Sequence, residues 1–167
     1  MSKKPKREIK YYTAGEKTKT HFFKLLAQED VVICVIIVDK MNRKISDTPE
    51  NYAALCVLLL EDVVRITSKI GAIYFDRHFS KNVHTKTFET IVRSLVGYDI
   101  PIYHVDSKRD RRVNVADMVA GAMLAHETGR DIRFANMIKQ NIRNVQRINW
   151  WTVKINLMTT KNLPEPV

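Results

Sequence analysis

Three aspartates stand where carboxylates often do chemistry in α/β proteins. Asp76 follows the apolar segment 72–75, Asp106 follows the apolar segment 101–105, and Asp117 interrupts an apolar segment shortly afterwards. Ligands of open α/β sheets gather at the carboxyl ends of the strands. We therefore predict that these three carboxylates form the functional centre of the protein.

A divalent cation would explain an aspartate in such an apolar setting. The residues around Asp117 are mostly small and should let its helix approach the sheet closely: Val113, Ala116, Ala120, Gly121 and Leu124. A carboxylate near the sheet surface is costly to ionise without a partner. Magnesium takes oxygen ligands, and two such ions would activate water and stabilise the leaving oxygen in phosphodiester cleavage. We predict Mg²⁺ or Mn²⁺ bound by Asp76 and Asp117.

Each of these residues also has a plain structural interpretation. An aspartate after a strand is commonly a helix cap or a turn former, and Asp117 could form a salt bridge with Arg77 or Arg112. The basic loop 108–112 is normally a solvated turn, but beside a metal ligand it could hold a phosphate backbone. Trp150 and Trp151 could stack on bases, although packing onto the core is the more common role of such a pair.

Composition and charge narrow the class of partner. The chain has 167 residues, 45% of them hydrophobic, and lysine plus arginine exceed aspartate plus glutamate by 28 to 18, a net charge of +10. This excess favours a polyanionic partner, most plausibly nucleic acid. The longest apolar runs are too short to span a membrane, and no segment resembles a signal peptide. Cys34 and Cys56 lie far apart without a CxxC pattern, which is typical of buried thiols in the cytoplasm.

The order of the expected elements predicts an α/β fold. Helices are expected over about 17–28, 47–68, 83–96, 113–128 and 131–143, and strands over 31–38, 72–75 and 101–105, with a strand or extended tail over 146–158. Strands that alternate with helices predict a largely parallel sheet around the second and third strands. Residues 31–38 form a continuous β-branched run, which is typical of a strand buried on both faces. We divide the chain into a basic start (1–7), one domain (8–145) and a C-terminal segment (146–167).

Several short motifs come in the order and spacing of one known family. They are Glu8-Ile9-Lys10, Val38-Asp39-Lys40, Tyr74-Phe75-Asp76-Arg77, His104-Val105-Asp106-Ser107-Lys108 and Asn114-Val115-Ala116-Asp117-Met118-Val119-Ala120-Gly121-Ala122. Over about residues 7–145 the chain resembles the "domain of unknown function 3800" family, whose members are regarded as ribonuclease H-like. The last motif usually begins Leu-Gln, and here Asn114 stands where glutamine is expected.

The resemblance implies a ribonuclease H-like mixed sheet flanked by helices and a metal-dependent nuclease. At the matching positions, the resemblance implies that four residues act as catalytic acids: Asp76, Asp106, Asp117 and Glu8. The basic residues beside those acids are expected to bind substrate: Lys10, Arg77, Lys108 and Arg109.

One departure from the family pattern affects the expected activity. Family members begin with a strand that carries Asp-Glu-Ser-Gly, followed by a second strand, and this chain has neither. We therefore expect the C-terminal majority of such a domain. A sheet that lacks a central strand exposes its edges, which favours pairing with a second copy or with a chain that supplies the strand. The alternative function is a nucleic-acid-binding or partner-binding module that has lost catalysis.

Overall fold

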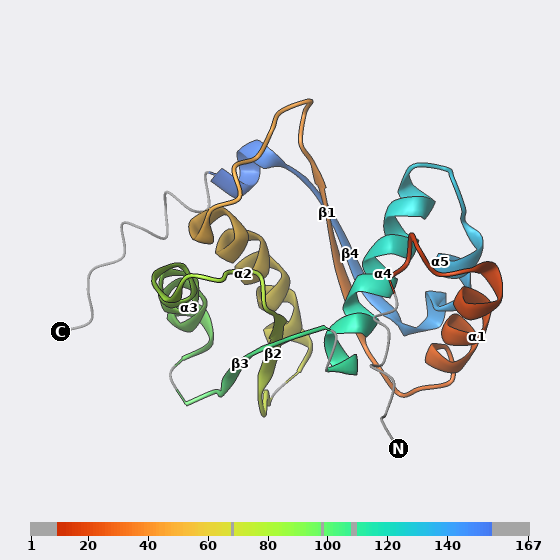
Figure 1. Cartoon of the computed structure of the whole chain (residues 1–167), viewed down its shortest axis with the longest axis horizontal. Coiled ribbons are helices and arrows are strands. Elements are labelled where there is room, and N and C mark those ends of the chain that lie inside the picture. The colour runs from red at the N-terminus through yellow and green to blue at the C-terminus, as the bar shows by residue number, and fades with distance from the viewer. Residues whose placement is uncertain (1–9, 68, 98, 108–109, 155–167) are drawn as a thin grey trace, which may run out of the picture. The chain divides into compact units, whose positions relative to one another are not determined.

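The computed structural model describes residues 10–67, 69–97, 99–107 and 110–154 (Figure 1). Helices and short strands alternate along this part of the chain, which confirms the mixed α/β class. The chain divides into two compact units. The first comprises the described residues of 10–33, 72–78 and 102–143, and the second those of 34–71, 79–101 and 144–154.

The first unit contains the two strands that carry the candidate site. β2 (Ile73–Asp76) and β3 (Ile102–Val105) pair in parallel, with Ile73 opposite Ile102 and Asp76 opposite Val105. The expected parallel pairing of these strands is thus confirmed. The helices of this unit are α1 (Glu16–Leu26), α4 (Arg111–Glu127), α5 (Arg133–Met137) and the short 3₁₀ helix η1 (Lys139–Asn141).

An aromatic cluster forms the core among α1, α4 and α5. The rings of Tyr11, Phe23 and Phe134 are all buried, with centroid distances of 6.3 Å, 6.1 Å and 5.3 Å. Two of these pairs are edge-to-face, a geometry that adds about 0.5–1.5 kcal/mol per pair beyond the burial of area. Met118 and Ala122 of α4 are fully buried as well.

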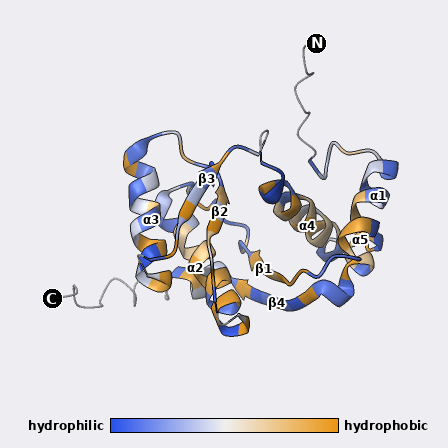
Figure 2. Ribbon diagram, turned by 90° about the horizontal axis from the view of Figure 1, so that it is seen from below, coloured by the Kyte–Doolittle hydropathy of each residue, from blue (hydrophilic) through white to orange (hydrophobic). Residues whose placement is uncertain are grey.

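The second unit is built on a helical pair, α2 (Pro49–Ile66) and α3 (Asn82–Val96). The Thr48 side chain accepts the Asn51 main-chain N–H at 3.3 Å and caps α2, whose start lies close to the predicted residue 47. Gly97, at φ 84°, follows the last residue of α3, and the helix ends at the predicted residue 96. Much of α2 is orange in Figure 2, the colour of hydrophobic residues. Ala54 and Leu58 of this helix form a core with Trp150 and Val153.

The remaining strands differ from the prediction in length and in burial. β1 (Ile33–Asp39) pairs with β4 (Ile142–Asn149), and in the described residues β1–β4 and β2–β3 are separate two-stranded sheets. Val31 and Val32 are exposed and most of β1 is half-buried, so the expected burial on both faces is wrong. A two-stranded sheet has too few neighbours to cover such a strand completely.

The segment after α4 contains the largest error in the expected elements. The helix predicted over 131–143 is a short α5, then η1, and β4 already begins at Ile142. The strand predicted from residue 146 is confirmed up to Asn149. Residues 150–154 are helical, and the rest of that prediction lies outside the described residues. No helix in the described ranges has the length and apolar character needed to cross a membrane.

Candidate functional site

The parallel register brings Asp76 and Asp106 to the same edge of the β2–β3 sheet. Asp76 is the last residue of β2, and Asp106 directly follows its register partner Val105. The Ser107 main-chain N–H donates to Asp76 Oδ1 at 3.3 Å, and the Arg77 N–H donates to the Val105 carbonyl at 2.8 Å. The chain leaving β3 is therefore tied to the carboxylate that ends β2.

A pocket of about 390 Å³ opens beside this edge. Its lining comes from the ends of the two strands and the start of α4: Arg77, His104, Val105, Asp106 and Asp110. The Asp110 N–H donates to the Asp106 carbonyl at 2.9 Å, which holds the residue before α4 close to Asp106. The Asn114 side-chain amide donates to the Ser107 carbonyl at 3.0 Å and ties the same connection to α4. The pocket thus combines carboxylates with an exposed arginine.

Asp117 has a different environment from the one that we expected. Its side chain is exposed, and its Oδ2 accepts the Tyr11 main-chain N–H at 3.5 Å. α4 does contact β2, as expected, but the small residue Gly121 makes room for Tyr11. A Cβ on Gly121 would lie 2.4 Å from Tyr11 Cβ. Asp117 and Gly121 are one helical turn apart, so the same face of α4 holds both contacts.

The three predicted aspartates are not gathered around one ion. Across the described ranges, no three His, Cys, Asp or Glu side chains lie in position to hold a single metal ion. Asp76 and Asp106 share the strand edge, whereas Asp117 contacts the Tyr11 segment. Magnesium needs only one or two protein carboxylates when water and phosphate complete its shell, so Asp76 and Asp106 would be enough in number for one ion.

Of the basic residues predicted to bind substrate, only Arg77 and Lys10 lie in the described part of the chain. Arg77 is exposed and lines the pocket, and Lys10 is exposed in the segment that precedes Tyr11. Glu8, Lys108 and Arg109 lie outside the described residues.

Sequence reasoning missed the role of Asp110. Its carboxylate caps α4 by accepting the Arg112 main-chain N–H at 2.9 Å, and it also binds the Arg112 guanidinium through Nε (2.9 and 3.1 Å) and Nη2. These hydrogen bonds lower the pKa of Asp110 to about 2. The same contacts raise the pKa of Arg112. The signal in the sequence was an aspartate directly before an apolar helix, which is a preferred cap.

A pair of tyrosines was also missed. Tyr74 and Tyr103 are register partners on β2 and β3, and their rings stack with centroids 5.0 Å apart. The shared Ile-Tyr sequence at 73–74 and 102–103 could have indicated this pairing. On the other face of the two strands, Phe75 stacks with His104.

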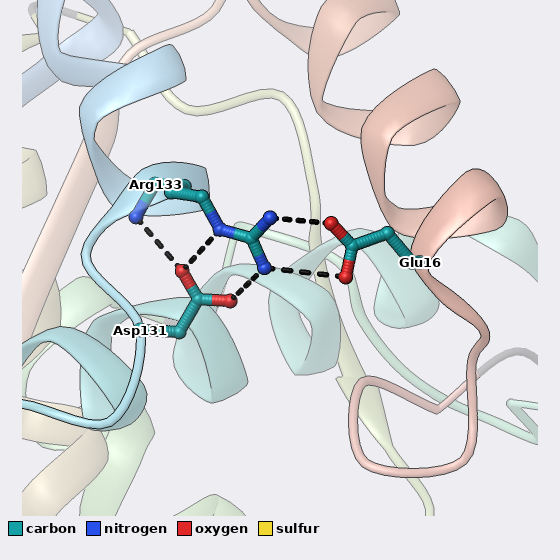
Figure 3. Close-up of polar contacts among 3 residues, drawn as sticks. All are labelled: Glu16, Asp131 and Arg133. Carbon is teal, nitrogen blue, oxygen red and sulfur yellow. Dashed lines mark hydrogen bonds and ion pairs between the residues drawn. The ribbon is translucent and has the colours of Figure 1, made fainter.

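A second ionic cluster links α1 to the start of α5 (Figure 3). Arg133 binds Glu16 through both terminal nitrogens and Asp131 through Nε and Nη2, at 3.0 and 2.9 Å for the latter pair. The hydrogen bonds from Arg133 lower the pKa values of both carboxylates. Because both carboxylates bind Arg133, we assign this cluster a structural role, in which it links α1 to α5.

The cysteines and tryptophans of the second unit have structural positions. Cys34 and Cys56, both within the described ranges, are free thiols, and burial raises the pKa of Cys56 to about 12. Trp150 packs in the core, as the commoner alternative predicted. Trp151 is exposed, and the Arg43 guanidinium lies 5.3 Å from its ring centroid.

Comparisons with known proteins identify no relative of this chain. No protein-family model matches it, and no curated protein and no solved structure matches it either.

Proposed function

We propose that this chain is a divalent-metal-dependent nuclease that hydrolyses phosphodiester bonds, with Asp76 and Asp106 at the centre of its site. One observation carries the proposal: the parallel strands β2 and β3 are paired in register, and each has an aspartate at its end or directly after it. The proposal includes the ribonuclease H-like arrangement that the motifs imply, and a cytoplasmic setting in keeping with two free thiols.

The chemistry of the two carboxylates suits Mg²⁺ or Mn²⁺. Asp76 is exposed, and Asp106 lines the adjoining pocket, so both can be reached by a hydrated ion. Such an ion would lower the pKa of a bound water and neutralise charge on the phosphate. Arg77 lines the same pocket and would hold a phosphate oxygen through its guanidinium.

Electrostatics supports nucleic acid as the substrate. The net charge of +10 attracts a polyanion over a long range and lowers the dissociation constant at low salt. Of the other basic residues near the strand ends, Arg111 is exposed at the first position of α4.

The proposal is tested by cleavage assays on the purified full chain. Labelled DNA and RNA oligonucleotides, single-stranded and duplex, are incubated with Mg²⁺, with Mn²⁺ or with EDTA. We expect cleavage only with metal, and we expect its loss in Asp76→Asn and in Asp106→Asn, with circular dichroism unchanged. Asp39→Asn is the matched control, because Asp39 also ends a strand but its carboxylate accepts the Met41 N–H at 2.7 Å in a turn. Cleavage that persists in both site variants would reject the assignment.

A binding module without catalysis is the second candidate. It is favoured by the lack, among the described residues, of three acids placed around one ion. Binding of oligonucleotides with a steep salt dependence, but no cleavage with either metal, would support this candidate over the nuclease.

A further inference from the structure

Two tyrosine rings are exposed together on one face of the β2–β3 sheet. Tyr74 is 36% exposed and Tyr103 is 46% exposed, and their stacked rings are inclined by only 17°. Neighbouring strands lie about 4.8 Å apart, so register partners hold their rings at close to stacking distance. The platform of Tyr74 and Tyr103 is therefore set by backbone pairing rather than by mobile loops.

Arg112 completes the platform on the Tyr74 side. Its Cζ lies 3.6 Å from the Tyr74 ring centroid, and Asp110 fixes the guanidinium by the contacts given above. A guanidinium this close and a stacked ring cannot share one face of Tyr74 without overlap. Arg112 and Tyr103 therefore cover opposite faces of Tyr74, and the next position in the stack is the outer face of Tyr103.

We propose that the outer face of Tyr103 stacks an unpaired base, with Tyr74 and Arg112 as the residues that position it. This inference rests on the proposed nucleic-acid function and specifies its substrate class as single-stranded nucleic acid. Every base has a π-face that can stack on an aromatic ring, whereas the bases of a duplex are already stacked on one another. The excess of positive charge attracts the backbone of the same strand.

The platform lies beside the proposed catalytic edge. Side chains alternate along a strand, so Tyr74 and Asp76 share a face of β2 and lie about 6.6 Å apart along it. The burial pattern of β2 agrees, with Ile73 buried and both Tyr74 and Asp76 exposed. A nucleotide held at Tyr103 would thus place its backbone near the strand ends.

The test measures binding in EDTA, where hydrolysis does not contribute. Fluorescence anisotropy compares a labelled 12-nucleotide oligothymidylate with a duplex of the same length. We expect the single strand to bind more tightly, and Tyr103→Ala to weaken the binding of the single strand by roughly 5- to 150-fold. Tyr103→Phe should bind like the wild type, because it keeps the ring. Tyr12→Ala is the matched control, since Tyr12 is 61% exposed but lies outside the platform. Equal affinity of Tyr103→Ala and wild type would overturn the proposal.

A second measurement uses the unmodified protein and does not depend on the folding of a variant. An oligothymidylate that carries 5-iododeoxyuridine is bound and irradiated, and the cross-linked peptide is sequenced. A cross-link at Tyr103 supports the platform, and cross-links confined to other aromatic residues reject it. Binding that depends on Tyr103 without any cleavage would reject the nuclease but keep the platform. Metal-dependent cleavage with unchanged binding in Tyr103→Ala would do the reverse.

Discussion

The close approach of α4 to Tyr11 makes Gly121→Ala a sharp test of this fold. A Cβ at position 121 would lie 2.4 Å from both Cβ and Cγ of Tyr11, and 2.8 Å from Cδ1. These atoms lie near the backbone, so the side chain cannot relieve the overlap by turning at its far end. Tyr11 is only 4% exposed and its ring packs against Phe23 and Phe134, which leaves little room for a shift.

Two opposing effects determine the size of the change in stability. Overpacking of a dense core costs about 1–3 kcal/mol, and the contact with Cβ and Cγ puts this site near the upper end. Alanine gains about 1 kcal/mol over glycine inside a helix. We therefore expect a net loss of about 2 kcal/mol, which corresponds to a fall in Tm of roughly 4–8 °C for a chain of this size.

Thermal and urea unfolding, followed by circular dichroism, measure this loss. Ala120→Gly is the matched control for the helix term, since Ala120 is an exposed neighbour on the same helix and the change should cost only about 1 kcal/mol. The double variant Tyr11→Ala/Gly121→Ala removes the contacts with Cγ and Cδ1, so its loss should be smaller than the sum of the single losses. A Gly121→Ala variant as stable as the wild type would refute the close approach.

Two further predictions follow from the shifted pKa values. Asp110 should titrate with a pKa of about 2 in carboxyl NMR, and in Arg112→Gln its pKa should return toward the ordinary ~3.9. Because the pKa is lowered in the folded wild type, the contribution of Asp110 to stability is present above pH ~3.9 and is lost as the pH falls toward 2. An ordinary value in the wild type would contradict the contact. The second prediction concerns Cys56, whose pKa is about 12. In a Cys34→Ser background, Cys56 should react with a disulfide reagent at pH 8 far more slowly in the native chain than in urea. Equal rates in the two conditions would contradict its burial.

The strand ends and the helix caps were predictable because local rules determine them. Thr48 and Pro49 are preferred at the start of a helix, and Gly97 adopts the positive φ that favours glycine at its end. The parallel pairing of β2 and β3 follows from a helix placed between two apolar strands. From that pairing, the nearness of Asp76 and Asp106 could be predicted without any coordinates.

The start of the C-terminal strand could not be predicted from local pattern. Ile138, Ile142 and Val145 follow the i, i+4, i+7 spacing that is typical of one helical face, not of a strand. In the structure this spacing is overridden, because Ile142–Asn149 pairs with β1, more than a hundred residues earlier in the chain. Such long-range pairing depends on tertiary context, which a short window of sequence does not contain.

The small-residue face of α4 shows why the site could be predicted only in part. Small residues indicate that something approaches the helix closely, but they do not identify the partner. The small residues predicted an approach to the sheet, and α4 does contact β2. The closest approach at Gly121, however, is that of Tyr11, which also donates its N–H to Asp117. A substitution at Asp117 therefore removes both a metal ligand predicted from the sequence and a hydrogen bond to the backbone of a core tyrosine. Within the described ranges, the Asp76 carboxylate accepts a single hydrogen bond, from the Ser107 N–H, so loss of cleavage in Asp76→Asn reports on the site itself.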